Sequence, residues 1–210
     1  MLAADTGARV LKLVLATANR GKQRELEALL APLGIRPVLQ SELGIDNVAE
    51  TGATFEANAL LKAQHAALLS GLPALADDSG LEVDALGGRP GVRSARYAGE
   101  SATDAQNNAR LMKELEAVPP ERRTARYRCV LALVREAHDP SPLIAVGSWE
   151  GRIAMSPAGR GGFGYDPLFL PDGQAGSAAQ LPAEVKNALS HRGRALQNLV
   201  SQLQRRASHP

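Results

Sequence analysis

The chain has 210 residues, of which 44% are hydrophobic and 22% charged, so it can bury a substantial core and lacks the composition of a disordered protein. Its formal net charge of +2 and aromatic content of 3% argue against a dedicated nucleic-acid-binding protein. A single cysteine excludes a disulfide within one chain. No segment approaches the ~20 apolar residues of a membrane span, and no signal-peptide pattern opens the chain, so we expect no membrane association and a cytoplasmic location.

The first segments predict the opening unit of an α/β fold. The apolar run at residues 10–16 predicts a strand, and a polar loop separates it from a helix that ends at Gly34. Residues 36–39 are expected to form the next strand. A second helix is predicted from its N-cap, Thr54, to about Ser70. The first helix carries leucines at helical spacing: Leu26, Leu29, Leu30 and Leu33.

Strands, loops and helices continue to alternate along the rest of the chain. Residues 73–76 predict a buried strand, and residues 87–91 form a glycine- and proline-rich loop. A third helix is expected at residues 103–117, and the last one starts near Ser190. Two apolar runs joined by a turn-prone segment predict a pair of long strands: residues 126–134 and 143–149.

These elements together predict one α/β domain. We expect it to span residues 1–206 and to be followed by a disordered tail at residues 207–210. Cys129 lies within an apolar run, where a buried strand residue is a better interpretation than a catalytic thiol.

The loop after the first strand has features of an anion site. Asn19, Gly21 and Lys22 lie between a strand end and a helix start, where unpaired backbone N–H groups and the helix dipole attract anions. Lys22 adds a positive charge within reach of a phosphate. The loop does not match the longer Walker motif of phosphate-binding loops. An ordinary turn with a solvated lysine is therefore the alternative.

A pair of acids, Asp77 and Asp78, follows the predicted strand at residues 73–76. Carboxylates at the carboxyl end of a strand lie where open α/β sheets bind ligands, and Mg²⁺ prefers such oxygens. Adjacent strand residues face opposite sides of a sheet, so we expect one of the two carboxylates to dominate a metal site. A solvated turn is the alternative.

The second predicted helix carries a polar stripe formed by Asn58, Lys62 and His65. Such a stripe is usually a solvent-facing surface. The alternative is that Lys62 points into a cleft toward phosphate, with Glu50 as a second acid near the metal.

Phe163 and Tyr165 lie in a glycine-rich loop rather than on a periodic apolar face. An exposed ring between glycines could stack on a nucleobase, whereas the alternative is a rigid turn anchored by an aromatic residue.

Ser190 suits a helix N-cap, which places His191 and Arg192 in the first turn. Cations there oppose the helix dipole, so the pair indicates either a functional position or a plain surface.

Five segments in this order resemble the non-standard purine nucleoside triphosphate pyrophosphatases, the Ham1-like or inosine triphosphate pyrophosphatase family. They are ATANRGKQREL, ETGATFEANALLKAQHAA, ALADDSGLEVDALGGRPGVRSARYAG, GGFGYDPLF and EVKNALSHRGRAL. The resemblance covers nearly the whole chain. In the first loop Ala18 replaces the family's usual glycine, which would strain the backbone if φ were positive there.

The resemblance implies a long, twisted, mixed β-sheet flanked by helices, with two lobes around a central nucleotide cleft, and a homodimer. It also implies Mg²⁺-dependent hydrolysis of ITP, dITP and XTP to the monophosphate and pyrophosphate. Asp78 would be the general base, Glu50 and Asp78 would bind the metal, and Lys22 and Lys62 would offset phosphate charge. The triphosphate would be held by Thr17, Ala18, Asn19, Arg20, Gly21 and Lys22. The rest of the nucleotide would contact Ser79, Phe163, Gly164, Tyr165, Asp166, Lys186, His191 and Arg192.

Three other functions are alternatives to this one. A Maf-like pyrophosphatase acting on pyrimidine triphosphates would share the fold class, but the Gly-Phe-Gly-Tyr-Asp loop and the Ser-His-Arg element argue against it. A nucleotide-binding module without catalysis is opposed by the retained acids, and a nucleic-acid-binding protein by the weak net charge.

Overall fold

The computed structural model describes residues 12–208. Its strands are β1 (Val14–Ala16), β2 (Val38–Leu39), β3 (Ala74–Val83), β4 (Thr124–Val134), β5 (Leu143–Ile153) and β6 (Phe169–Pro171). Its α-helices are α1 (Arg20–Leu30), α2 (Phe55–Ser70), α3 (Asp104–Glu114), α4 (Ala183–Leu189) and α5 (His191–Ser208). The strands form one mixed sheet in the order β2-β1-β3-β4-β5-β6, which confirms the expected fold class.

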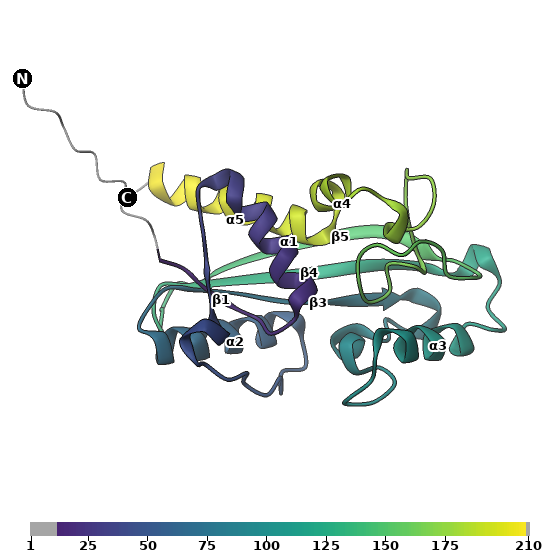
Figure 1. Cartoon of the computed structure of the whole chain (residues 1–210), viewed down its shortest axis with the longest axis horizontal. Coiled ribbons are helices and arrows are strands. Elements are labelled where there is room, and N and C mark those ends of the chain that lie inside the picture. Colours follow the sequence, from purple (N-terminus) through teal and green to yellow (C-terminus); the bar gives the residue numbers. More distant parts are fainter. Residues whose placement is uncertain (1–11, 209–210) are drawn as a thin grey trace, which may run out of the picture.

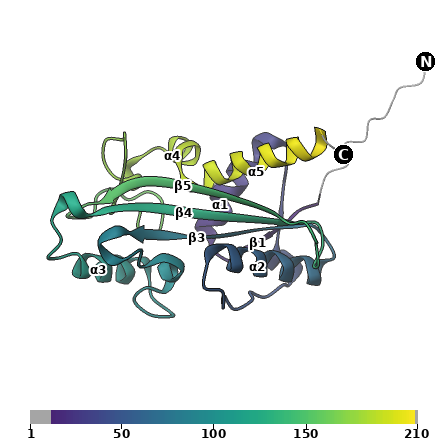
Figure 2. The same cartoon turned by 180° about the vertical axis from the view of Figure 1, so that it is seen from behind.

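Helices cover both faces of this sheet. α1, α4 and α5 lie on one face, and α2 and α3 lie on the other, under different halves of the long strands (Figure 1). Figure 2 shows the same two layers from behind. None of the described helices is long and apolar enough to cross a membrane.

The sheet changes from parallel to antiparallel at β3. β1 pairs in parallel with β2 and with β3, but it ends at Ala16, opposite Ala76. β3 continues to Val83, paired on its other side with antiparallel β4. Beyond Ala76, β3 therefore has a strand neighbour on one side only, until Glu82 bridges to Pro90. This notch at the end of β1 positions the candidate site.

The prediction that Asp77 and Asp78 follow the strand is wrong, because both lie inside β3. Their backbones pair with Leu131 and Val130 of β4, and this ladder carries the strand through the acids. They still lie at the carboxyl end of the parallel part of the sheet, since β1 stops one residue earlier in the register.

The hydrophobic core differs between the two halves of the sheet. Around β1 and α2 it is built from small and aliphatic side chains, such as Ala59, Ala63 and Val130. α1 and α5 pack leucines against the opposite face, including Leu26 and Leu196. The half near α3 holds five of the chain's seven aromatic residues: Tyr97, Tyr127, Trp149, Tyr165 and Phe169.

Most predicted elements are confirmed with shifted ends. Thr54 caps α2 by accepting a hydrogen bond from the Ala57 N–H at 3.1 Å. α1 passes into a short 3-10 turn before Gly34, which has φ of 71°. β4 and β5 extend beyond their predicted ranges, because they pair along almost their whole length.

Among the α-helices and strands of residues 12–208, two were not predicted, α4 and the short edge strand β6. α5 also continues through residues 207–208, so these belong to the helix and not to the expected tail. Residues 209–210, and the first two residues of the apolar run at 10–16, lie outside the described part of the chain.

Candidate functional site

Two adjoining cavities open at the notch where β1 ends. One has a volume of about 640 Å³ and is lined by charged side chains, among them Lys22, Glu50, Lys62 and Asp78. The other measures about 280 Å³ and is lined by Phe163 together with aromatic, polar and charged groups. The two share part of their walls: Asn19, Lys22, Ser79 and Ala95. They therefore form one continuous site with a charged end and an aromatic end.

The loop after β1 is fixed by its own hydrogen bonds. The Asn19 side chain caps α1 and accepts from the N–H groups of Gly21 and Lys22 at 2.9 and 3.0 Å. The Thr17 hydroxyl accepts from the Asn19 N–H at 3.2 Å. No non-glycine residue in the described chain has a positive φ, so Ala18 replaces the usual glycine without backbone strain.

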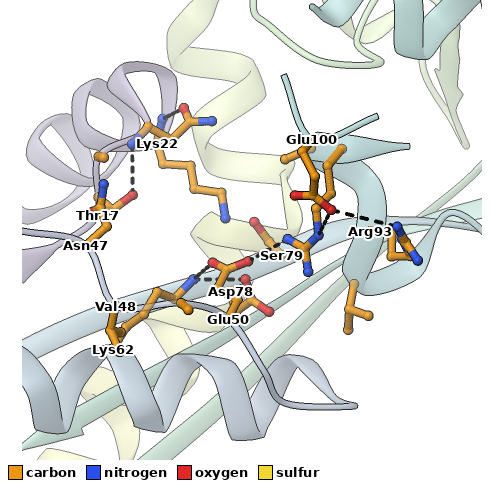
Figure 3. Close-up of a pocket in the computed structure, with 16 residues that line it drawn as sticks. Thr17, Lys22, Asn47, Val48, Glu50, Lys62, Asp78, Ser79, Arg93 and Glu100 are labelled. Atoms are coloured by element: carbon orange, nitrogen blue, oxygen red, sulfur yellow. Dashed lines mark hydrogen bonds and ion pairs between the residues drawn. The ribbon is translucent and has the colours of Figure 1, made fainter. Parts of the chain in front are cut away.

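Members of this loop point in different directions. Thr17, Ala18 and Asn19 line the charged cavity, and the Lys22 side chain extends into it (Figure 3). Arg20 is exposed and lines neither cavity. Gly21 is buried on the opposite side, under Phe163.

Gly21 allows Phe163 to approach α1 closely. A Cβ atom at position 21 would lie 2.5–2.8 Å from three carbons of the Phe163 ring, well inside van der Waals contact. A glycine in the first turn of a helix costs helix stability, but here it lets the ring pack beside the loop after β1.

The charged cavity brings together Glu50, Lys62 and Asp78 (Figure 3). The Lys62 ammonium lies 2.7 Å from a Glu50 oxygen and 2.9 Å from an Asp78 oxygen. Asn58 donates to the other Asp78 oxygen at 3.2 Å. Of the polar stripe on α2, Asn58 and Lys62 thus face the site, whereas His65 contacts the Asp46 carbonyl oxygen instead.

The two carboxylates of this cluster are in different electrostatic states. Burial raises the pKa of Asp78, and the negative charge of Glu50 adds to the rise, so the ion pair with Lys62 does not fully offset it. Burial also acts to raise the pKa of Glu50, but Lys62 outweighs it and the pKa is lowered. Arg96, which contacts Glu50 at 3.2 Å, contributes in the same direction.

Glu50 and Asp78 are the carboxylates that could hold a divalent cation. Within residues 12–208 no three His, Cys, Asp or Glu side chains form a metal-binding group. Mg²⁺ usually binds through one or two carboxylates, with water and substrate phosphates completing its coordination. Two acids converging beside two lysines fit that kind of cation better than a metal held by protein ligands alone.

Asp77 points to the opposite face of the sheet, as its place in β3 requires. It is fully buried, and Lys22 reaches one of its oxygens at 2.6 Å while the Nε atom of Arg192 reaches the other at 3.0 Å. Burial alone would raise the pKa of Asp77, but these two positive charges hold it well below its usual range. Asp77 therefore stays ionised between two cations.

An acid that the sequence analysis missed continues this network. Glu25 of α1 forms ion pairs with Lys186 and Arg192, and burial is again outweighed by these cations, so the pKa of Glu25 is lowered. Lys186 also pairs with Asp166 in the glycine-rich loop. A signal for Glu25 was available, because it lies three residues after Lys22 and so shares a face of α1.

His191 and Arg192 are buried and do not form a charged surface. Burial, with the charge of Arg192 adding to it, holds the pKa of His191 well below its usual range, so the imidazole is neutral. Its ring stacks on Tyr127 with centroids 4.7 Å apart, and Nδ1 has no hydrogen-bond partner in the described part of the chain. The Ser190 hydroxyl caps α5 by accepting from the Gly193 N–H at 3.2 Å. The expectation of two cations in the first turn of α5 is therefore wrong, because Arg192 alone is charged there. The carboxylates of Asp77 and Glu25 neutralise its charge.

The glycine-rich loop contains one aromatic residue that anchors the loop and one whose ring is partly exposed. Tyr165 is buried and its hydroxyl donates to the Ser94 carbonyl at 2.8 Å, so it anchors the loop. Phe163 is only partly buried, and its ring faces the Lys186 ammonium at 5.0 Å. The Gly164 N–H donates to Asp104 at 2.6 Å, which ties the loop to α3. Phe163 is thus the more exposed of the two rings, and it lines the aromatic cavity.

Comparisons with known proteins identify the family to which the chain belongs. A family model described as the Ham1 family matches residues 13–202. A protein of Methylococcus capsulatus named dITP/XTP pyrophosphatase is 59% identical, with 91% of this chain and 96% of that protein covered. One of the same name from Shigella flexneri is 55% identical, with 91% and 98% covered. A solved HAM1 protein of Coxiella burnetii superimposes with a TM-score of 0.85 at 48% identity, covering 93% of this chain and 99% of that one. The chain belongs to the Ham1 family.

Proposed function

We propose that this protein hydrolyses the non-standard purine nucleoside triphosphates ITP, dITP and XTP to a monophosphate and pyrophosphate. The observation that carries the proposal is the continuous pair of cavities. One is lined by two lysines and by acids that include Glu50 and Asp78, and the other is lined by Phe163. A nucleoside triphosphate has the matching order of parts, an anionic chain joined to a flat base. The names of the bacterial relatives, dITP/XTP pyrophosphatase, support the same activity.

In the proposed reaction, a water attacks the α-phosphorus. The bond from the water oxygen to phosphorus forms, the bond to the bridging oxygen of the leaving pyrophosphate breaks, and Asp78 accepts the proton. Burial and Glu50 raise the pKa of Asp78, which makes the ionised carboxylate a better proton acceptor than an ordinary aspartate. Lys22 and Lys62 place positive charge where the departing group accumulates negative charge.

The metal that we propose is Mg²⁺, held by Glu50 and Asp78. When bound, it would neutralise phosphate charge and make the attacking water more acidic. Lys62 lies between the two carboxylates and holds them together, so the chain itself prearranges both acids.

The aromatic cavity is proposed to select the base. Hypoxanthine and xanthine present a 6-oxo acceptor, whereas adenine presents an amino donor at that position. Arg192 has five N–H donors, and hydrogen bonds to Asp77, Glu25 and Ser79 leave others for a base. Donors left unpaired by adenine can reject it by up to about 10⁴-fold.

A substrate panel tests the function. Pyrophosphate release is measured from ITP, XTP, dITP, ATP, GTP, dTTP and UTP, each with and without Mg²⁺. Fast, Mg²⁺-dependent release from the first three alone is the expected result. A preference for pyrimidines would indicate a Maf-like activity, and no release from any substrate would indicate a binding protein.

Assembly and location follow the same proposal. The family resemblance supports a homodimer acting in the cytoplasm, where its nucleotide substrates are found. Light scattering on the purified protein tests the dimer, and a monomer at micromolar concentration would contradict it.

A further inference from the structure

Six buried or half-buried charges of alternating sign connect the two cavities. The Lys22 ammonium at the phosphate loop pairs with Asp77, which pairs with Arg192. Arg192 pairs with Glu25, Glu25 with Lys186, and Lys186 with Asp166 beside Phe163; the order is Lys22, Asp77, Arg192, Glu25, Lys186 and Asp166. We call these six residues the charge chain. It runs from the charged cavity to the loop that carries the aromatic ring.

Asp77 occupies a special place in the charge chain, because it lines neither cavity and has no exposed surface. It therefore has no route to a substrate or to the reacting water. Its two neighbours both line the aromatic cavity, and Lys22 lines the charged one as well. Asp77 can therefore affect the reaction only through Lys22 and Arg192.

Both oxygens of Asp77 are saturated, each by one charged and one neutral donor. Lys22 at 2.6 Å and the Ser79 hydroxyl at 2.8 Å contact one oxygen. Arg192 at 3.0 Å and the Cys129 thiol at 3.0 Å contact the other. Four donors on a buried carboxylate fix its orientation, so the carboxylate fixes the two cations in turn.

We propose that Asp77 is a positioning residue that holds the phosphate-binding lysine, Lys22, and the base-pocket arginine, Arg192, in a fixed relation to each other. The inference rests on the proposed function. It predicts that Asp77 affects both the rate of phosphate chemistry and the choice of base, although it contacts neither part of the substrate.

The direct test is Asp77→Asn. An amide has one oxygen and one NH₂ group, so whichever way it turns, one of the two cations faces a donor in place of an acceptor. Lys22 is the more vulnerable of the two, because within residues 12–208 it forms an ion pair with Asp77 alone, whereas Arg192 keeps Glu25.

The expected result is a split between binding and turnover. The variant site gains one positive charge, so its affinity for pyrophosphate, measured by calorimetry, should equal or exceed that of the wild type. Turnover of ITP should nevertheless fall roughly tenfold or more because the cations are misplaced, and the ratio of ITP to ATP hydrolysis should narrow. Wild-type turnover with a wild-type ratio would overturn the inference.

A matched control separates positioning from stability. Asp139 is also a buried, ion-paired aspartate, held by Arg135 at 2.7 Å in the turn between β4 and β5. Asp139→Asn makes the same chemical change away from the cavities, so it should lower the melting temperature while leaving turnover and the ITP-to-ATP ratio unchanged. If Asp139→Asn produced the same loss of turnover and ratio as Asp77→Asn, the effect would be structural and the inference would fail.

A second variant covers the case in which Asp77→Asn does not fold. Lys22→Met with Asp77→Asn removes a cation together with its partner, so no charge is buried alone, and Arg192 retains Glu25. The double variant should turn over ITP at the same rate as Lys22→Met alone, because both variants lack the lysine that Asp77 positions. The ratio of ITP to ATP hydrolysis should be lower in the double variant, because Asp77 no longer positions Arg192. An unchanged ratio would overturn the inference. Inactivity of the wild type on ITP would instead refute the proposed function.

Discussion

Asp77 and Asp78 are neighbours in β3 but occupy opposite environments. Asp77 faces α1 and α5, where two cations hold its pKa well below the usual range. Asp78 faces α2, where burial and Glu50 raise its pKa despite the ion pair with Lys62. The strand's alternation thus gives one carboxylate that stays a fixed anion and one that is prepared to accept a proton.

The largest expected effect is on the Asp78 side. Asp78→Asn removes the proton acceptor but keeps the shape and one oxygen, so turnover of ITP should fall at least ~100-fold while the melting temperature changes little. The ITP-to-ATP ratio should remain that of the wild type, in contrast to Asp77→Asn. Near-normal turnover in the Asp78 variant would remove it as the base.

On the Asp77 side, Arg192→Ala should cost stability and selectivity together. It leaves the buried Asp77 with Lys22 as its only cation, and breaking a buried ion pair costs about 3–5 kcal/mol. Chemical denaturation checks the stability, and the ITP-to-ATP ratio should narrow because donors toward the base are lost. An unchanged ratio would remove Arg192 from base recognition.

The raised pKa of Asp78 predicts an acid limb in the pH dependence of kcat/KM, because the base must be unprotonated and activity falls as pH falls through that pKa. Lys62 lowers this pKa, so Lys62→Met should raise the pKa of Asp78. Glu50 raises it, so Glu50→Gln should lower the pKa of Asp78. Both pKa shifts are measured without Mg²⁺, by NMR titration of the Asp78 carboxyl group, and shifts in the same direction for the two variants would contradict the assignment.

The smallest expected effect concerns the position of the Phe163 ring against Gly21. Gly21→Ala places a methyl group against the ring and should displace it, raising KM for ITP a few-fold with little change in kcat. Ala18→Gly, at an exposed position just before α1, is the matched control, and near wild-type values are expected. An unaltered KM in Gly21→Ala would show that the ring position does not matter for binding.

Much of this arrangement could be predicted from the sequence because it depends on local patterns. Hydrophobic periodicity and the N-cap Thr54 predicted the main helices and the two long strands. Alternation along a strand predicted that Asp77 and Asp78 would separate to opposite faces. Cys129 was correctly expected to be buried.

What could not be predicted depends on contacts between distant segments. That β3 continues through the acids is decided by pairing with β4, about fifty residues later in the chain. The partners of Glu25, Lys186 and Arg192, belong to α4 and α5, so the sequence of α1 alone could not identify them. The neutral state of His191 follows from burial, which local sequence does not report.

The central claim is that a water served by Asp78 attacks the α-phosphorus, and isotope labelling tests it most directly. ITP is hydrolysed in ¹⁸O-enriched water and the products are separated and analysed by mass spectrometry. The account predicts that the label appears in the monophosphate and not in pyrophosphate. Label in pyrophosphate would place the attack at the β-phosphorus and contradict the account.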